Sequence, residues 1–458
     1  MESPVTNVAS QLEATTVRFV REHGLPGASV GIVHGGELAW NDSIGFADVS
    51  EGRAADSTTL YRIGSITKTF TAVAVMRLRD EGKLHLDDPA VAFLPELRDA
   101  ASPFGPIESV TIRRLLTHES GLAGDPPDTD WAGPTYEGLA ERNLARASEI
   151  GTRVAPHLQH KYSNLGYQLL GEVVARVSGV AYVEYVTREI IDRLGMRGTS
   201  FEPLSEPLLK RTATGYASPF LTDDLNVAPT PPNIWAEGGL WSSVDDLGSW
   251  ITLQLSGAKT SLEDGVLQPS TLRQMHRPRF LADEAWIEAW GIGWYARRRD
   301  ELIWIQHGGA ISGFRANVCF DPGYRLGAIV LLNGDADASL LSMDIATIAL
   351  GAVTSAQPKA EPPIATPEEY RALLGVYIDP GSGWLVRVEW REGSLRIVDP
   401  ADPTWRPTLI PTSEKDRFVV DLGVREAGEP AIFRRLSDGR VGAVFVASQT
   451  WMRLDPVS

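Results

Sequence analysis

Two residues in the first quarter of the chain, Ser65 and Lys68, have the types and the spacing that covalent catalysis requires. A serine hydroxyl is a weak nucleophile until a base removes its proton, and a neutral lysine amine can act as that base. Residues three apart share one face of a helix, so the two side chains can meet. The following segment, 66–78, is largely apolar, and burial in such surroundings disfavours the charged form of a lysine. This pair predicts acyl-enzyme chemistry.

The same spacing occurs again at Ser256 and Lys259, among glycine and polar residues that are typical of a solvated helix end or turn. The context of Ser65 is different. Gly64 precedes it, and a glycine lets another segment of backbone approach closely. We also expect Ser65 to open the helix as its N-terminal cap. The context therefore favours Ser65 as the nucleophile.

A third candidate is Tyr162, which belongs to the only Tyr-x-Asn sequence in the chain and is followed by Asn164. A phenol held between a serine and a lysine can relay protons to a leaving group. The neighbouring amide can hold the lysine and a substrate amide in register. Serine and asparagine are also common in turns, so a turn tyrosine remains the alternative interpretation.

The last candidate segment is His307-Gly308-Gly309-Ala310, which follows the strand-like run Leu302 to Ile305. Glycines at a strand end allow a substrate chain to lie against the backbone, and the next N–H can point at a developing oxyanion. A similar triplet, His34-Gly35-Gly36, joins two expected strands and is interpreted as a hairpin turn. Only the later segment follows the other two motifs along the chain.

In this order the motifs resemble the β-lactamase and penicillin-binding protein superfamily of active-site serine enzymes, in particular its class C-like branch. That branch shows Ser-x-x-Lys, Tyr-x-Asn, and then His-x-Gly or Lys-x-Gly. The resemblance covers roughly residues 10–355 and includes three further stretches: 115–122, 194–196 and 238–247.

The resemblance implies a role for each matching residue. Ser65 is the expected nucleophile and Lys68 the expected general base, although which group removes the serine proton is disputed across such enzymes. The remaining roles are proton relay for Tyr162, substrate positioning for Asn164, an oxyanion hole from the N–H groups of Ser65 and Ala310, and substrate contacts for Gly239, Trp241 and Gly309. His307 stands where many penicillin-recognising relatives have lysine. A permanent charge suited to a β-lactam carboxylate is then missing, which disfavours antibiotic hydrolysis.

Composition narrows the classes of partner. With 43 basic and 59 acidic residues the net charge is -16, which disfavours nucleic acids and anionic membranes. The single Cys319 excludes a disulfide framework within the chain. No signal peptide or membrane-spanning segment is recognisable, so we expect a cytoplasmic enzyme. The two histidines at 157 and 160 lack an accompanying carboxylate pattern, so we expect neither a metal nor a cofactor.

Three regions are expected along the chain: a catalytic domain at 1–356, a stiff polar linker at 357–367, and a small β-barrel at 368–458. Strands at both ends of the first region, with helices between them, predict an α/β (α+β) fold in which helices flank one antiparallel sheet. Short alternating strands after the linker resemble the lipocalin-like domain of some peptidases and esterases of this superfamily.

This combination of domains is similar to the penicillin-binding-protein-type thioesterases, which take a peptide from a peptidyl carrier protein and close it head to tail. The leading hypothesis is therefore release and cyclisation of a nonribosomal peptide that has a D-residue at its C-terminus. Glu237 is expected to receive an incoming ammonium, and Arg453 a carboxylate or a peptide carbonyl. The alternative interpretations are a solvated loop glutamate and a surface arginine on a strand. The alternatives are a D-stereospecific aminopeptidase or amidase, a carboxylesterase, or a relative that only binds a ligand without catalysis.

Overall fold

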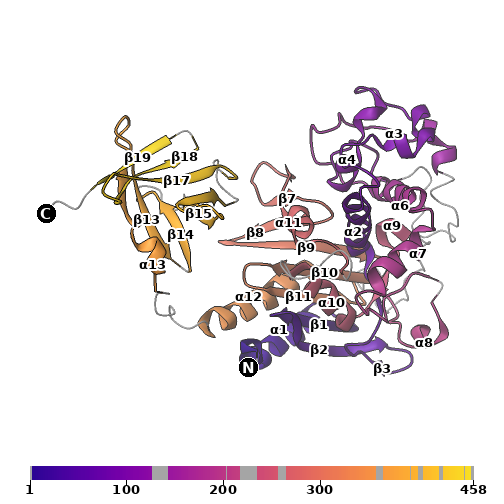
Figure 1. Cartoon of the computed structure of the whole chain (residues 1–458). Helices are drawn as coiled ribbons and strands as arrows, with labels where there is room; N and C mark the ends of the chain where they lie inside the picture. Colours follow the sequence, from indigo (N-terminus) through magenta and orange to yellow (C-terminus); the bar gives the residue numbers. More distant parts are fainter. Residues whose placement is uncertain are drawn as a thin grey trace. The chain divides into compact units, whose positions relative to one another are not determined.

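The chain forms two compact units, Met1–Ala356 and Gln357–Ser458 (Figure 1). The structure, a computed structural model, describes residues 3–125, 143–202, 204–216, 235–255, 265–356, 365–391, 393–400, 406–421, 427–447 and 449–454. Two features discussed above lie wholly or mostly outside these ranges: the second serine–lysine pair at 256 and 259, and the expected linker at 357–367.

The first unit contains a nine-stranded antiparallel sheet with the order β3-β2-β1-β11-β10-β9-β8-β7-β6. Its strands are β1 (Gly27–His34), β2 (Glu37–Asp48), β3 (Arg53–Ala54), β6 (Phe280–Leu281), β7 (Glu288–Trp290), β8 (Tyr295–Arg299), β9 (Leu302–Ile311), β10 (Phe314–Asp321) and β11 (Leu326–Leu332). Ala28 pairs with Leu332, so early and late segments of the unit meet at the centre of the sheet. The α+β fold expected from the sequence is confirmed.

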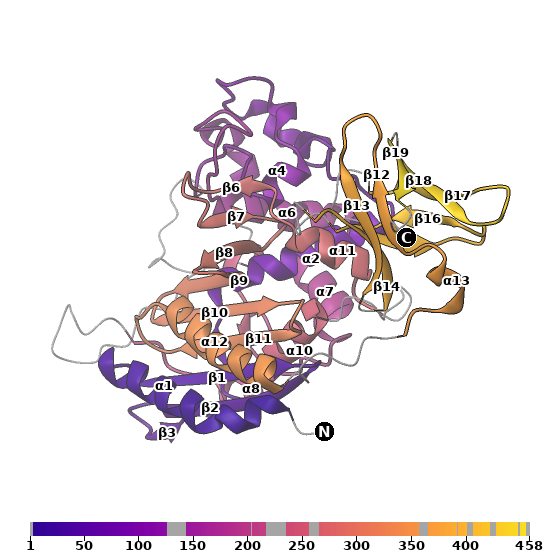
Figure 2. The same cartoon turned by 90° about the vertical axis from the view of Figure 1, so that its left-hand side faces the viewer.

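Helices cover both faces of this sheet. Figure 2 shows α1 (Ala9–Glu22) and α12 (Ala338–Ala356) on one face, where they share a core with β1 and β11. On the other face, α10 (Val244–Leu255) packs on the sheet, and its Trp250 stacks on Phe70 with ring centroids 3.8 Å apart. Among the described residues, α12 alone is long and apolar enough to span a membrane, and its packing on β10 and β11 accounts for that composition.

A helical lobe stands beside the sheet. Its helices and those bordering it are α2 (Thr67–Asp80), α3 (Ala90–Phe93), α4 (Ile112–Leu116), α6 (Asn164–Ser178), α7 (Tyr182–Val186), α8 (Glu206–Leu209), α9 (Trp235–Gly238) and α11 (Pro269–His276), and a two-stranded ribbon is formed by β4 (Tyr61–Arg62) and β5 (Trp241–Ser242). Helix α6 begins where the Ser163 hydroxyl accepts a hydrogen bond from Gly166 N. It ends at Gly179, whose φ of 77° suits a glycine.

The second unit is a closed barrel of eight antiparallel strands that follows the short helix α13 (Glu368–Arg371). Its strands are β12 (Gly375–Ile378), β13 (Leu385–Arg391), β14 (Ser394–Val398), β15 (Thr408–Pro411), β16 (Arg417–Val420), β17 (Pro430–Arg435), β18 (Val441–Val446) and β19 (Gln449–Leu454). Alternate side chains point inward, and Tyr377, Phe433 and Trp451 fill the core. The barrel expected from the sequence is confirmed.

Candidate active site

Ser65 and Lys68 meet at the start of α2. The Lys68 amine donates a hydrogen bond of 3.0 Å to Ser65 Oγ and one of 2.6 Å to the backbone carbonyl of Glu237. The lysine side chain is fully buried. Ser65 itself lies in a 3-10 turn, Gly64–Ile66, and does not cap the helix, which corrects the expectation from the sequence. The Ser65 hydroxyl accepts a hydrogen bond from the Lys68 amine, not from a backbone N–H of the helix.

Strand β9 lies directly against this turn. A Cβ atom on Gly309 would be 3.2 Å from Ser65 N, and one on Gly64 would be 2.9 Å from Ala310 N. Only glycines permit this approach, and Gly64 also has a φ of 49°. This contact places the backbone nitrogens of Ser65 and Ala310, the expected oxyanion pair, close to each other. The glycines lie within β9, not at its end as the sequence suggested.

His307 is a neutral group in this arrangement. Its Nδ1 lies 2.7 Å from the Gly308 carbonyl oxygen, which can only accept, so Nδ1 carries the proton and Nε2 keeps its lone pair. Burial, assisted by the Lys68 charge, lowers the pKa of His307 to about 3, against a raising effect of the Gly308 carbonyl. The side chain therefore supplies no positive charge for a substrate carboxylate.

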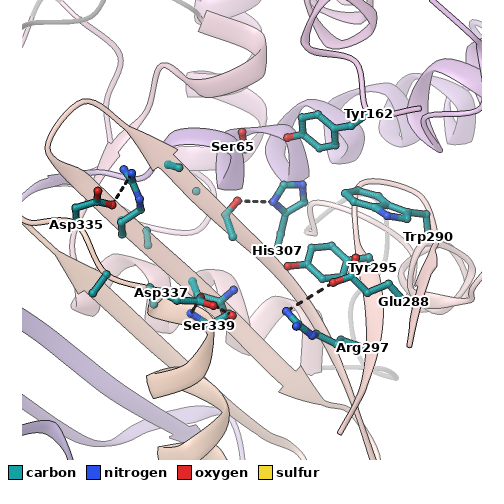
Figure 3. Close-up of a pocket in the computed structure, with 18 residues that line it drawn as sticks. Ser65, Tyr162, Glu288, Trp290, Tyr295, Arg297, His307, Asp335, Asp337 and Ser339 are labelled. Carbon is teal, nitrogen blue, oxygen red and sulfur yellow. Dashed lines mark hydrogen bonds and ion pairs between the residues drawn. The ribbon is translucent and has the colours of Figure 1, made fainter. Parts of the chain in front are cut away.

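Tyr162 is held between the lysine and an aromatic cluster. Lys68 Nζ lies 5.0 Å from the centroid of its ring, and His118 stacks on the ring with a centroid distance of 4.2 Å. Figure 3 shows the Tyr162 hydroxyl pointing toward Ser65. The Trp290 ring meets His118 edge to face, with ring centroids 4.8 Å apart, and stacks on His160, with ring centroids 4.9 Å apart. The phenol therefore lies beside the serine–lysine pair, and its role as a proton relay stays a prediction.

The two histidines of this cluster, His118 and His160, were not assigned a role from the sequence. Ser163 N donates to His118 Nδ1 at 3.1 Å, so Nδ1 is an acceptor and the proton is on Nε2. Burial lowers the pKa of His118 well below its usual value and that of His160 to about 4. Both rings are neutral near pH 7. His118 lies in the stretch 115–122, which resembles the class C-like branch, and this resemblance could have marked it as a candidate site residue.

A cleft of about 690 Å³ opens from Ser65 and Tyr162 along β9 (Figure 3). The other lining residues are Glu288, Trp290, Tyr295, Arg297, His307, Gly308, Gly309, Ala310, Arg315, Ala316, Asn317, Asp335, Ala336, Asp337, Ala338 and Ser339. Two ion pairs stand in its wall: Arg315 with Asp335 at 2.6 Å, and Arg297 with Glu288 at 3.6 Å. None of these four residues stands out in the sequence, because the partners come from separate strands and loops. The wall combines apolar surface with charged groups of both signs.

Three predicted substrate residues stand apart from this cleft lining. The Asn164 amide donates to Asp125 at 2.7 Å, not to Lys68. Trp241 is buried behind the site, where its indole N–H donates to Glu202. Gly239 is also buried and outside the lining. Another tryptophan, Trp290, is in the lining.

The two charged residues expected to bind substrate have partners of their own. Glu237 is 2% exposed, and its carboxyl accepts a hydrogen bond from Gln168. A carboxyl buried in this position does not meet an ammonium that enters the cleft, which corrects the expectation from the sequence. Arg453, in the barrel, donates to the carbonyls of Ala372 and Leu374 at 2.7 and 2.9 Å. Its substrate role stays a prediction.

Among the described residues, no group of three or more His, Cys, Asp and Glu side chains could hold a metal ion. Cys319 is a free, buried thiol on β10. Burial raises its pKa to about 12, so the thiol stays protonated and unreactive near pH 7. The Ser65 hydroxyl, which accepts a hydrogen bond from Lys68, lines the cleft.

Comparison with known proteins agrees with this geometry. Protein flp of Staphylococcus aureus (strain COL) is 29% identical over 336 residues, which are 72% of this chain and 64% of that protein. The chain thus spans less than two thirds of the length of this relative. Esterase EstB of Burkholderia gladioli is 34% identical over 215 residues, which are 43% of this chain and 52% of that enzyme.

A solved structure extends the likeness to both units. The octameric penicillin-binding protein homologue from Pyrococcus abyssi superposes with a TM-score of 0.64 at 26% identity, covering 97% of this chain and 99% of the homologue. The family model "Beta-lactamase" matches residues 12–352. The chain therefore belongs to the beta-lactamase family of serine hydrolases.

Proposed function

We propose that the chain forms an acyl-enzyme on Ser65 and transfers the acyl group of a peptidyl ester or thioester. The observation that carries this proposal is the 3.0 Å contact between Lys68 Nζ and Ser65 Oγ at a buried position beside the cleft. In this proposal the Lys68 amine, at this distance, is the base that takes the serine proton as the oxygen attacks. The nucleophile, its base and an open cleft are thus next to one another.

The first half-reaction joins Ser65 Oγ to the acyl carbon. Lys68 accepts the serine proton, and the N–H groups of Ser65 and Ala310 stabilise the oxyanion. When the tetrahedral intermediate collapses, the bond to the leaving thiol or alcohol breaks. Tyr162 delivers a proton to that group and regains one from the Lys68 ammonium, so the acyl-enzyme is left with a neutral amine.

The second half-reaction decides between hydrolase and transferase. Attack by water gives a free acid, whereas attack by the N-terminal amine of the same acyl chain gives a cyclic peptide. We assign the second outcome to this protein, with a nonribosomal peptide that ends in a D-residue and is delivered by a peptidyl carrier protein in the cytoplasm. A cleft that combines apolar surface with paired charges along a strand suits a peptide better than a lipid.

A carboxylesterase is the second candidate, and its support is the 34% identity with Esterase EstB over 215 residues. A D-stereospecific aminopeptidase or amidase would use the same half-reactions with water as the acceptor. The neutral His307 argues against β-lactam antibiotics as the natural substrate. A relative that only binds ligands would have no use for the buried amine of Lys68.

The test uses linear peptidyl thioesters that end in either a D- or an L-residue, with the products weighed by mass spectrometry. We expect the D-terminated substrate to give a product lighter than the hydrolysed acid by one water, and the L-terminated substrate to react poorly. Free acids alone from every substrate would overturn the cyclase assignment in favour of a hydrolase. Intact-protein masses without an acyl adduct on Ser65 would overturn covalent catalysis.

A further inference from the structure

A buried carboxyl group lies behind the lysine of the proposed site. Glu237, on α9, is 2% exposed and does not line the cleft. Its backbone carbonyl accepts the 2.6 Å hydrogen bond from Lys68 Nζ, so the residue directly contacts the base. An ionisable group at such depth is costly unless its partners compensate for the lost water.

Those partners form a directed chain of amides. Asn143 Nδ2 donates to Gln168 Oε1 at 2.8 Å, and Gln168 Nε2 donates to Glu237 Oε1 at 2.5 Å. Because the Gln168 oxygen is occupied by Asn143, its NH₂ group must face the glutamate. Both amides are themselves 5% exposed. A donor fixed in this way stabilises the ionised carboxylate.

Burial of this group places its titration near neutrality. Burial raises the pKa of Glu237 to about 7, while the Gln168 hydrogen bond and the Lys68 charge act to lower it and the Asp125 charge to raise it. From α7, the Tyr182 hydroxyl faces the same region, and burial raises its pKa above the usual range. On α6, Tyr167 stays protonated for the same reason.

The histidines of the site change charge at lower pH. Burial lowers the pKa of His160 to about 4 and of His307 to about 3, and that of His118 well below its usual value. A change of charge near pH 7 is therefore the property of Glu237 and of none of these three rings.

We propose that Glu237 is a positioning residue whose carboxylate stabilises the Lys68 ammonium formed when the lysine takes the proton of Ser65. The inference rests on the acyl-enzyme function proposed above. The proton moves from Ser65 Oγ to Lys68 Nζ, and the new positive charge is balanced by the negative charge of Glu237. When Glu237 is protonated, the ammonium forms without that counter-charge in a buried site, and acylation is slower.

The experiment measures turnover of p-nitrophenyl butyrate between about pH 5.5 and 9. The pKa of about 7 includes the Lys68 charge, which the resting amine lacks, so kcat/KM of the unaltered enzyme should rise at or above pH 7 as Glu237 ionises. Glu237→Gln keeps the shape and an acceptor for Gln168 but removes the charge. We expect it to lose this rise and to lower kcat/KM at pH 8 by about tenfold. Glu184→Gln, an exposed residue of α7, is the matched control.

A second variant tests the same claim without altering the carboxyl. Gln168→Met removes the donor that lowers the pKa of Glu237, so the rise in kcat/KM should move to higher pH. The proposal is overturned if Glu237→Gln keeps the rise at the same pH, or if Gln168→Met leaves it in place. Should Glu237→Gln fail to fold, the Gln168→Met result decides.

Failure of this inference is distinguishable from failure of the proposed function. If Ser65 carries the butyryl adduct but the pH profiles are unaltered, acyl-enzyme chemistry stands and the role of Glu237 falls. If Ser65→Ala retains turnover, the acyl-enzyme function falls, and the role of Glu237 falls with it.

Discussion

Gly309 and Ile63 approach so closely that a Cβ atom on the glycine would lie 1.9 Å from the Ile63 carbonyl oxygen. No side chain fits in this space, so the strand and the nucleophile turn must separate if one is introduced. The relative position of Ser65 and Ala310, and with it the expected oxyanion hole, depends on this contact.

Gly309→Ala should therefore lower kcat/KM by about 100-fold, the scale on which a displacement of about 1 Å acts in catalysis. Gly308→Ala is the matched comparison, because its Cβ would meet Asn317 Nδ2 at 3.4 Å, an ordinary contact, and should cost far less. Steady-state kinetics with a p-nitrophenyl ester measure both. Equal losses in the two variants would contradict the close-approach argument.

Removal of either member of the central pair should abolish turnover for different reasons. Ser65→Ala removes the nucleophile, so no acyl adduct forms. Lys68→Met retains the nucleophile but removes the base, with an expected loss of about 100-fold or more in kcat. Intact-protein mass spectrometry and kinetics distinguish the two. Lys83→Met, at an exposed lysine, is the control and should behave like the parent chain.

Acid should destabilise the first unit through its buried histidines. The ring of His276 bonds Gln254 at 2.9 Å, and burial lowers its pKa from 6.5 to about 3. The unfolded state binds this proton at higher pH, so the stabilisation is complete above about pH 6.5 and is lost as the pH falls toward 3. Between pH 7 and 5 the loss is about 2 kcal/mol.

Thermal unfolding at a series of pH values tests this expectation. His276→Gln retains a donor for Gln254 without a titrating ring, so its melting temperature should fall less steeply below pH 6.5. His85→Gln, at an exposed histidine, is the matched control. Parallel pH curves for His276→Gln and the parent chain would show that His276 is not responsible.

Arg453 offers a choice between a structural and a binding role. Its guanidinium satisfies the carbonyls of Ala372 and Leu374, so Arg453→Ala should lower the stability of the barrel by about 1–3 kcal/mol. Chemical denaturation measures that loss. If KM for a peptidyl thioester also rises while the barrel remains folded, the substrate role expected from the sequence is supported as well.

Part of the fold could be predicted because its signals are local. The apolar run Leu326–Leu332 forms β11, and the alternating run Ser394–Val398 forms β14. Both contain buried residues bounded by polar turns. Strands β12 and β15 are harder to predict, because each has four residues, and β12 closes the barrel by pairing with the distant strand β19.

Site residues divide in the same way. Ser65 and Lys68 could be placed together from the sequence because helical geometry alone brings residues three apart onto one face. The environment of Glu237 could not be predicted from the sequence, because it depends on amides from two other segments of the helical lobe. A charged residue between apolar and glycine neighbours is usually solvent-exposed, and its burial here is a product of packing.

The amino-acid order by itself thus determined the reacting pair, the family motifs and the succession of catalytic unit and barrel, since each rests on short-range spacing or repeated patterns. Tertiary structure alone decided what surrounds the pair. The carbonyl of Glu237 meets Lys68 across 169 residues of sequence, and Gly309 meets the Ser65 turn from a strand near the other end of the unit. Such contacts follow from how buried surfaces fit together, which no local pattern encodes.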